Sequence, residues 1–218
     1  MAVRGPTYTP GLVSNLPYIL PPDLAAWLAS ALDVEGKLPR AVEALGPVSG
    51  RDVLLIDGQG SALDAAMTAQ GARIVHAGSG PPFRAAVADQ SMDAIVSLWS
   101  GFRGVDVDEL AEADRILRPG GRLLVVHDYG RDDVSRIQPD RPEFGAWSRR
   151  TGPFLTAGFR VRVLHCFWTF ETAARATAFL EAAFGEAGRD VALTLKRPRL
   201  SWNVAIYHRS RSAEPPPV

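Results

Sequence analysis

Two stretches of the chain carry residues that could bind or activate a ligand: a glycine turn and a histidine-aspartate pair. Asp57-Gly58-Gln59-Gly60 follows an apolar run, and its glycines would let a ligand approach backbone amides closely. His127 and Asp128 follow another apolar run, and the imidazole could act as a general base near neutral pH if it is correctly oriented. The alternative is that one member of this pair caps the backbone of the loop that follows. The sequence therefore predicts a ligand site at the turn and a candidate base at the pair.

Apolar runs alternate with helix-forming segments between residues 52 and 126, and this alternation would position both stretches. The pattern predicts strands at 52–56, 72–77, 93–98 and 122–126, and helices at 61–70 and 106–117. Strands that are apolar throughout and separated by helices are typical of a buried parallel sheet, whose ligands bind beyond the carboxyl ends of the strands. The predicted fold class is therefore α/β: a doubly wound, mostly parallel sheet, with an antiparallel edge formed by strands at 159–167 and 201–208.

The segments outside this alternation are predicted to form a cap, a tail and a few connections. Residues 1–46 are predicted to be a proline-rich arm and a helical cap whose first helix is N-capped by Asp23. The cap would cover one sheet edge, with a substrate lid or a homodimer contact as alternatives. Residues 47–210 would form the α/β domain, and residues 211–218 a disordered tail. Three further segments are expected inside the domain: a short edge strand at 83–87, a helix at 143–157 that is interrupted or bent at Gly152-Pro153, and a helix at 171–185.

The composition is that of an ordinary globular protein and argues against several kinds of partner. The 218 residues include 24 basic and 24 acidic side chains, and this balance gives no general attraction to nucleic acid or anionic lipid. No apolar run approaches the roughly 20 residues of a membrane span, and prolines interrupt the N-terminal segment, so we expect no membrane segment, no signal peptide and a cytoplasmic protein. The single Cys166 and the scattered histidines predict no disulfide and no metal site.

Two motifs in the second half of the alternation resemble those of a known enzyme family. The stretch from Asp89 to Ser97 reads DQSMDAIVS and leads into a strand, and the stretch from Glu112 to Val125 reads EADRILRPGGRLLV and joins a helix end to the next strand. With the order of the segments, these motifs make residues 47–210 similar to the class I S-adenosylmethionine-dependent methyltransferases, particularly the type 11 group. The resemblance implies a Rossmann-like methyltransferase fold, S-adenosylmethionine as cofactor and a small-molecule substrate.

The resemblance also implies which residues would hold the cofactor and which would act on the methyl acceptor. The family's glycine loop falls on residues 56–62, and the ends of the following strands supply the other contacts. The implied cofactor-binding residues are Asp57, Gly58, Gln59, Gly60, Gly78, Ser79, Asp89, Ser97, Leu98 and Trp99. Asp89 would either contact adenine or belong to the turn before Asp93, which its register matches better. Trp99 would either stack on a planar ligand or plug the crevice. His127 or Asp128 would assist deprotonation, since methyl transfer needs little else beyond positioning of the acceptor.

The chain departs from the family pattern at three places in this implied site. Ile56 stands at the first acidic position of the glycine loop, unless a shift of one residue lets Asp57 serve, and Ala62 stands at its third glycine. Gly78 stands where the family has an acidic residue that accepts hydrogen bonds from both ribose hydroxyls. Loss of this acceptor is expected to weaken cofactor binding by about one to two powers of ten. Only fourteen residues separate Gly78 from Asp93, too few for the helix and strand that the family places there.

Three functions remain open from the sequence. The first is a methyltransferase that acts on a small molecule and holds its cofactor loosely. The second is a catalytically silent methyltransferase-like binding or assembly module that has lost its cofactor, which Gly78 and the shortened segment after it suggest. The third is a protein that binds another nucleotide ligand in the same crevice, because a fold does not fix a function. An open, polar crevice would favour catalysis, whereas a crevice filled by side chains such as Phe83 and Trp99 would favour the second function.

Overall fold

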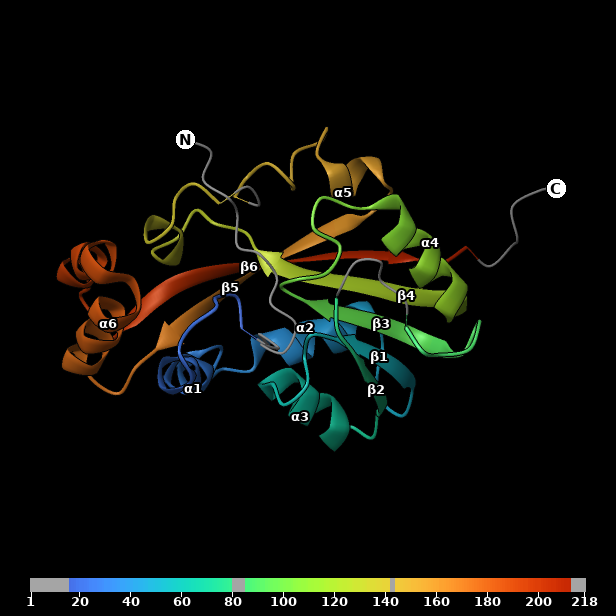
Figure 1. Cartoon of the computed structure of the whole chain (residues 1–218), viewed down its shortest axis with the longest axis horizontal. Coiled ribbons are helices and arrows are strands. Elements are labelled where there is room, and N and C mark those ends of the chain that lie inside the picture. Colours follow the sequence, from blue (N-terminus) through green and yellow to red (C-terminus); the bar gives the residue numbers. More distant parts are fainter. Residues whose placement is uncertain (1–15, 80–84, 142–143, 213–218) are drawn as a thin grey trace.

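A six-stranded sheet forms the centre of the computed structural model, which describes residues 16–79, 85–141 and 144–212 (Figure 1). Its strands are β1 (Asp52–Ile56), β2 (Arg73–Ala77), β3 (Met92–Leu98), β4 (Leu117–Asp128), β5 (Arg160–Thr169) and β6 (Arg199–Ser210). They lie in the order β2-β1-β3-β4-β6-β5, parallel from β2 to β4 and antiparallel from β4 to β5. The predicted α/β sheet, mostly parallel with an antiparallel edge, is therefore confirmed.

Helices cover both faces of this sheet (Figure 1). They are α1 (Pro22–Ala31), α2 (Lys37–Leu45), α3 (Ala62–Ala69), α4 (Val107–Ile116), α5 (Pro153–Thr156) and α6 (Ala173–Leu193), with a 3-10 turn at Val134–Arg136. One face packs against α1, α2, α3 and α6, through buried side chains that include Leu28, Val42, Met67 and Phe179. The other face packs against α4 and α5, through Ile116 and Phe154. Because both faces are buried, the middle of each central strand is apolar, as at 53–56, 94–96 and 123–126.

The register of the parallel strands brings their carboxyl ends to one level. Ile56 at the end of β1 lies opposite Ala77 of β2 and Ser97 of β3. Leu98 at the end of β3 lies opposite Val126 of β4. The residues that follow each strand therefore gather at one end of the sheet, as the sequence predicts for the candidate site.

Two expectations for the N-terminal half of the chain are not met. α1 begins at Pro22 after an extended Pro21, so Asp23 lies in the first turn and does not cap the helix. Proline suits this start, because its φ already fits a helix and its missing N–H needs no partner. Of the predicted edge strand, residues 83 and 84 lie outside the described part, and residues 85–87 form no strand. Most of the predicted arm (1–15) and most of the predicted tail (213–218) also lie outside it.

Two helix predictions in the C-terminal half were wrong in length. The helix expected at 143–157 is confined to α5, and the described residues before it form turns. Gly152 lies so close to the carbonyl oxygens of Ala146 and Trp147 that an added Cβ would be 2.6 Å from each. α6 continues beyond its expected end at Gly185, whose φ of 61° and ψ of −131° separate two helical parts. Glycine ends the first part, as expected, but the chain resumes a helix directly afterwards.

Candidate functional site

The glycine turn after β1 is closed by hydrogen bonds within the chain. Asp57 (φ 54°) and Gly60 (φ 74°) adopt left-handed backbone conformations that turn the chain from β1 into α3. Ser61 caps α3 by accepting a hydrogen bond from the Asp64 N–H. The Asp64 carboxylate accepts a hydrogen bond from the Gly60 N–H at 2.8 Å and lies 3.0 Å from Nε2 of His76. The backbone amide that was expected to face a ligand is therefore bonded to the first turn of α3.

The inner and outer residues of this turn differ in exposure. Gly58 is buried, and an added Cβ would lie 2.6 Å from a methyl carbon of Leu55. Packing against β1 therefore requires glycine here whether or not a ligand binds. Gln59 is exposed, and a Cβ added to Gly60 would meet no atom within 4 Å. Only the outer side of the turn faces open space.

The carboxylate of Asp57 is bonded to the end of β2. One oxygen accepts a hydrogen bond from the Ser79 N–H at 3.0 Å, and the other accepts one from the Ser79 hydroxyl. Asp57 is only 4% exposed, so both carboxylate oxygens are engaged inside the protein. Gly78, at the position of the family's ribose-binding acid, precedes this contact and carries no side chain. Asp57 therefore joins the ends of β1 and β2.

The end of β3 is filled by the loop that follows it. Gly101 lies against all three neighbouring strand ends: an added Cβ would be 2.6 Å from the Ser97 hydroxyl, 3.5 Å from Cβ of Ser79 and 3.7 Å from Cγ2 of Ile56. Ser97 is fully buried, and within the described chain its hydroxyl has no hydrogen-bond partner. Leu98 is 1% exposed and belongs to the core. Gly101 therefore packs directly against the three strand ends, and a side chain at this position has no room.

Trp99 continues this filling toward β4. The backbone N–H of Trp99 donates a hydrogen bond to the carbonyl oxygen of Val126 at 3.0 Å, which joins the loop to the neighbouring strand. Its indole is 7% exposed and lies 5.5 Å from the ring of Trp202, with the two planes tilted by 37°. Phe102, 1% exposed, follows in the same loop. This geometry fits a side chain that fills the crevice better than one that stacks on a ligand.

His127 is enclosed by the same loop and by aromatic side chains. Its Nε2 lies 3.1 Å from the carbonyl oxygen of Gly101, so we infer that Nε2 carries the proton. Its ring meets that of Trp147 edge-on at 4.9 Å. Burial, and to a smaller extent the nearby Arg103 cation, lower the pKa of His127 to about 3. In this environment the imidazole is neutral near pH 7 and a weak base.

Asp128 is held by two partners from distant parts of the chain. One oxygen accepts a hydrogen bond from Nε1 of Trp202 at 2.7 Å, and the other pairs with Arg141 at 2.5 Å. Arg141 also donates to the carbonyl oxygen of Pro17 at 3.3 Å, and its guanidinium lies 4.8 Å from the ring of Tyr18. Burial raises the pKa of Tyr18 well above its usual range, and the Asp128 carboxylate adds to this rise. Asp128 therefore anchors residues before α1 to the sheet.

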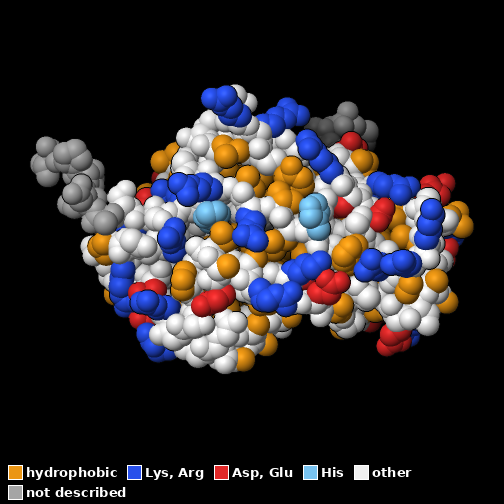
Figure 2. Space-filling model, turned by 180° about the vertical axis from the view of Figure 1, so that it is seen from behind, with side chains coloured by type: hydrophobic (Ala, Val, Ile, Leu, Met, Phe, Trp, Pro, Cys, Tyr) orange, Lys and Arg blue, Asp and Glu red, His pale blue; other side chains and the backbone are white. Residues whose placement is uncertain are grey.

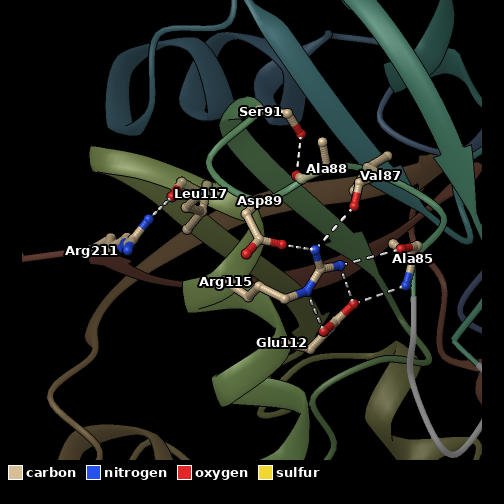
Figure 3. Close-up of polar contacts among 9 residues, drawn as sticks. All are labelled: Ala85, Val87, Ala88, Asp89, Ser91, Glu112, Arg115, Leu117 and Arg211. Carbon is tan, nitrogen blue, oxygen red and sulfur yellow. Dashed lines mark hydrogen bonds and ion pairs between the residues drawn. The ribbon is translucent and has the colours of Figure 1, made fainter.

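Asp89 lies at the other end of the sheet, because it precedes the first residue of β3 while the crevice lies beyond the last. Its carboxylate is 72% exposed and pairs with Arg115 of α4 at 2.5 Å (Figure 3). Arg115 also bonds to Glu112 at 2.7 and 2.9 Å and to the carbonyl oxygens of Ala85 and Val87. Arg115 therefore holds residues 85–89, in the shortened segment before β3, against α4. The structure therefore does not bring Asp89 to the other implied cofactor residues.

Sequence reasoning missed two residues that close the crevice. Asp64 stands three residues after Ser61, a spacing related to the capping box, so its engagement with the start of α3 carried a readable signal. Gly101 carried none, because its effect depends on contacts with three strands that are distant in the sequence. Asp64 contacts a residue close to it in the sequence, whereas Gly101 contacts residues that only the fold brings together.

Two hollows on the described surface lie away from the strand ends. One, of about 380 Å³, lies between α2 and β5; the other, of about 270 Å³, is lined mainly by residues 194–201. None of the residues implied for the cofactor lines either hollow. Among the described residues there is no group of three or more His, Cys, Asp or Glu side chains that could hold a metal ion. In the same part of the chain, no helix is long and apolar enough to span a membrane.

Comparison with solved structures identifies the fold. A candidate methyltransferase from an antibiotic biosynthesis pathway of Anabaena variabilis covers 82% of this chain and 98% of its own, with a TM-score of 0.51 and 12% identity. A candidate type II methyltransferase from Anaeromyxobacter dehalogenans covers 81% and 97%, with a TM-score of 0.49 and 19% identity. A geranyl diphosphate methyltransferase in complex with GPP and sinefungin covers 87% and 83%, with a TM-score of 0.45 and 15% identity. No protein-family model and no curated protein matches the chain significantly. The chain therefore has the class I methyltransferase fold, and at these identities the likeness is one of fold alone.

S-adenosylmethionine is the cofactor consistent with this fold, but the described residues at the strand ends do not fit it well. The Gly60 N–H is bonded to Asp64, and the Asp57 carboxylate is bonded to Ser79. Gly101 leaves no space beside Ser97, and Gly78 offers no acceptor for ribose hydroxyls. A ligand would therefore have to displace contacts that the protein makes with itself.

Proposed function

We propose that this protein is a methyltransferase-fold binding or assembly module that does not use S-adenosylmethionine. The observation that carries the proposal is the filled crevice: Trp99 and Gly101 occupy the strand ends, and the polar groups around them bond to one another. Displacing them would expose the buried indole and break the bond between Gly101 and His127. Both changes oppose ligand binding, because burial of an aromatic side chain and a satisfied buried hydrogen bond each stabilise the closed form.

A second candidate function is methyl transfer to a small molecule, favoured by the open outer side of the glycine turn at Gln59 and Gly60. In this case the loop after β3 would move away, and His127 or Asp128 would reach the acceptor. His127 would then have to regain a pKa nearer neutrality, since with a pKa of about 3 the imidazole is too weak a base to take a proton from the acceptor. Asp128 would have to leave Arg141.

Isothermal titration with S-adenosylhomocysteine, and separately with S-adenosylmethionine, tests this choice. We expect no saturable heat up to about 1 mM ligand, which corresponds to binding weaker than about −4 kcal/mol. The variant Gly78→Asp restores the family's ribose-binding acid and serves as the matched comparison. It should also give no heat, because the contacts of Asp57 and Gly101 are unchanged. Micromolar binding to the natural chain, or cofactor that copurifies with it, would establish the methyltransferase candidate instead. Binding by Gly78→Asp alone would show that the missing acid, and not the filled crevice, prevents binding.

A further inference from the structure

β5 is the last strand of the sheet, and its outer edge is only partly covered. Toward its carboxyl end, the carbonyl oxygen of Phe167 accepts a hydrogen bond from the Asp33 N–H at 3.1 Å. Orientation alternates along an antiparallel strand, so Val161 and Val163 also turn their N–H and C=O groups away from β6. Within the described part of the chain, these groups have no hydrogen-bond partner. Residues 160–164 therefore present an open backbone edge, called the β5 edge below.

The hollow of about 380 Å³ lies beside the β5 edge. It is lined by Lys37, Arg40, Ala41 and Ala44 of α2 and by residues 162–165 of β5. Lys37 closes one end, because its Nζ donates to the carbonyl oxygen of His165 at 2.7 Å and pairs with Glu35 at 2.7 Å. The hollow thus has a helix on one side and an open strand edge on the other. An extended peptide could lie in it along the strand.

Positive side chains surround the β5 edge. Arg160 and Arg162 are exposed and have no ion-pair partner among the described residues. They point to the α2 side of the sheet, because Leu164, next in the alternation, packs in the core on that side. His208 lies opposite Arg160 on β6, and its pKa is lowered by burial and by the cations of Arg122 and Arg160. Figure 2 views the molecule from behind and shows Lys and Arg side chains gathered around two histidines. In a chain without net charge, this is a local excess of positive charge.

At the other end of β5, two cations lie over the ring of Phe167. Nζ of Lys37 lies 5.1 Å and the guanidinium of Arg199 lies 4.2 Å from the ring centroid of Phe167. The second hollow, beside this ring, is lined by Lys196, Arg197 and Arg199 among others. Single-stranded nucleic acid binds through aromatic faces on which its bases stack, and cations already lie over this ring. An open backbone edge flanked by unpaired arginines fits an acidic peptide better.

We propose that the β5 edge binds an extended acidic segment of a partner protein, which adds as a further strand to the sheet. Its backbone would bond to the outward groups of Val161 and Val163, and its carboxylates would pair with Arg160 and Arg162. In this mode of recognition, backbone hydrogen bonds supply affinity and side chains supply specificity. A second copy of the chain is a poor occupant, because pairing two such edges would bring four arginines together. The β5 edge does not include the strand-end crevice, so this proposal holds or fails independently of cofactor binding.

Fluorescence anisotropy with the full chain and a fluorescein-labelled ten-residue peptide of alternating glutamate and threonine tests the charge component. We expect saturable binding in dilute salt that weakens about tenfold or more near 0.5 M NaCl, because ion pairs at an exposed edge are screened. The double variant Arg160→Glu/Arg162→Glu should weaken binding about tenfold or more. Its matched control is Arg149→Glu/Arg150→Glu, which reverses two exposed charges in the turn before α5, on the opposite face of the sheet. Equal loss in both double variants would overturn the assignment to the β5 edge.

A chemical change in the peptide tests strand addition while the protein stays unchanged. Two peptides of the same sequence are N-methylated at alternate residues, one at the odd and one at the even positions. We expect one of them to bind about tenfold more weakly than the other, because only one set of amides faces β5. Equal binding of the two would overturn strand addition. Tighter binding of a ten-nucleotide oligothymidylate than of the peptide would identify nucleic acid as the partner and overturn the proposal.

Discussion

The carboxyl ends of the parallel strands and the β5 edge are two places where a sheet of this kind offers polar groups to a ligand, and here they differ. At the strand ends the groups bond to one another, as Asp57 does to Ser79 and Asp128 does to Arg141. At the β5 edge, Arg162 and the outward backbone of Val163 have no such partner in the described chain. The polar groups at the strand ends are therefore engaged within the protein, whereas the β5 edge still presents backbone and charged groups that a partner could contact.

Removal of Asp128 should give the largest effect and is the strongest test that the strand ends are core. The variant Asp128→Ala leaves Arg141 and Nε1 of Trp202 without their partner. Breaking a fully buried pair costs about 3–5 kcal/mol, and because Arg141 keeps 19% exposure we expect about 3 kcal/mol. Urea denaturation measures the loss, and Asp128→Asn, which keeps an acceptor, should lose less. A loss under about 1 kcal/mol would mean that these groups are solvated like surface pairs.

Truncation of Trp99 tests whether its ring fills the crevice. The variant Trp99→Ala removes a side chain that is 7% exposed and should cost about 3 kcal/mol of unfolding free energy. Trp99 has φ of 62°, a left-handed conformation that strains alanine by about 1 kcal/mol and does not strain glycine. Trp99→Gly should therefore be the more stable of the two variants by thermal or urea denaturation. The reverse order would show that this backbone conformation is not the one populated in solution.

The sequence predicted most of the fold because its signals are local. The apolar run at Val53–Ile56 followed by glycines predicts a buried parallel strand and a turn, and both are present. The motif that contains Pro119-Gly120-Gly121 predicts the end of α4 and a following strand, although β4 begins earlier, at Leu117. The helix expected at 143–157 was wrong before Gly152, because the turns there depend on close packing against backbone carbonyls that residue types do not reveal. The interruption expected at Gly152-Pro153 is present, since α5 begins at Pro153.

The state of the candidate site could not be predicted, because it depends on which groups meet across the strands. Asp57 was identified as a site residue, but only the structure brings Ser79 to both of its oxygens. His127 was identified as a candidate base, but only tertiary burial lowers its pKa. Sequence spacing predicts which residues arrive at an edge of a sheet, and long-range contacts decide whether those residues remain available to a ligand.

His127 gives the filled crevice a measurable pH dependence. Burial lowers its pKa from 6.5 to about 3, and unfolding restores the ordinary value. Below pH 6.5 the unfolded chain takes up a proton at His127 that the folded chain does not. The contribution of neutral His127 to the free energy of unfolding is therefore fully present above pH 6.5 and is lost as the pH falls toward 3. We expect a loss of about 2 kcal/mol between neutral pH and about pH 5. The variant His127→Gln can still donate a hydrogen bond to Gly101 and does not titrate. Over the same pH range its free energy of unfolding should therefore fall by about 2 kcal/mol less than that of the natural chain. Equal changes in both proteins would contradict the burial of His127.

The smallest effect is expected at Asp89, and it tests which end of the sheet this residue serves. Its ion pair with Arg115 is 72% exposed on the Asp89 side, and exposed pairs contribute about 0.2–1 kcal/mol. Arg115 also keeps its bonds to Glu112, so Asp89→Ala should lower the free energy of unfolding by less than about 0.5 kcal/mol. Glu112→Ala is the matched comparison: Glu112 is 5% exposed and bonds to Arg115 and the Ala85 N–H, so its loss should cost several times more. Because Asp89 precedes β3, its removal should leave both the peptide titration and the S-adenosylhomocysteine titration unchanged. A cost of more than about 1 kcal/mol for Asp89→Ala would contradict the exposed ion pair that holds Asp89 at this end of the sheet.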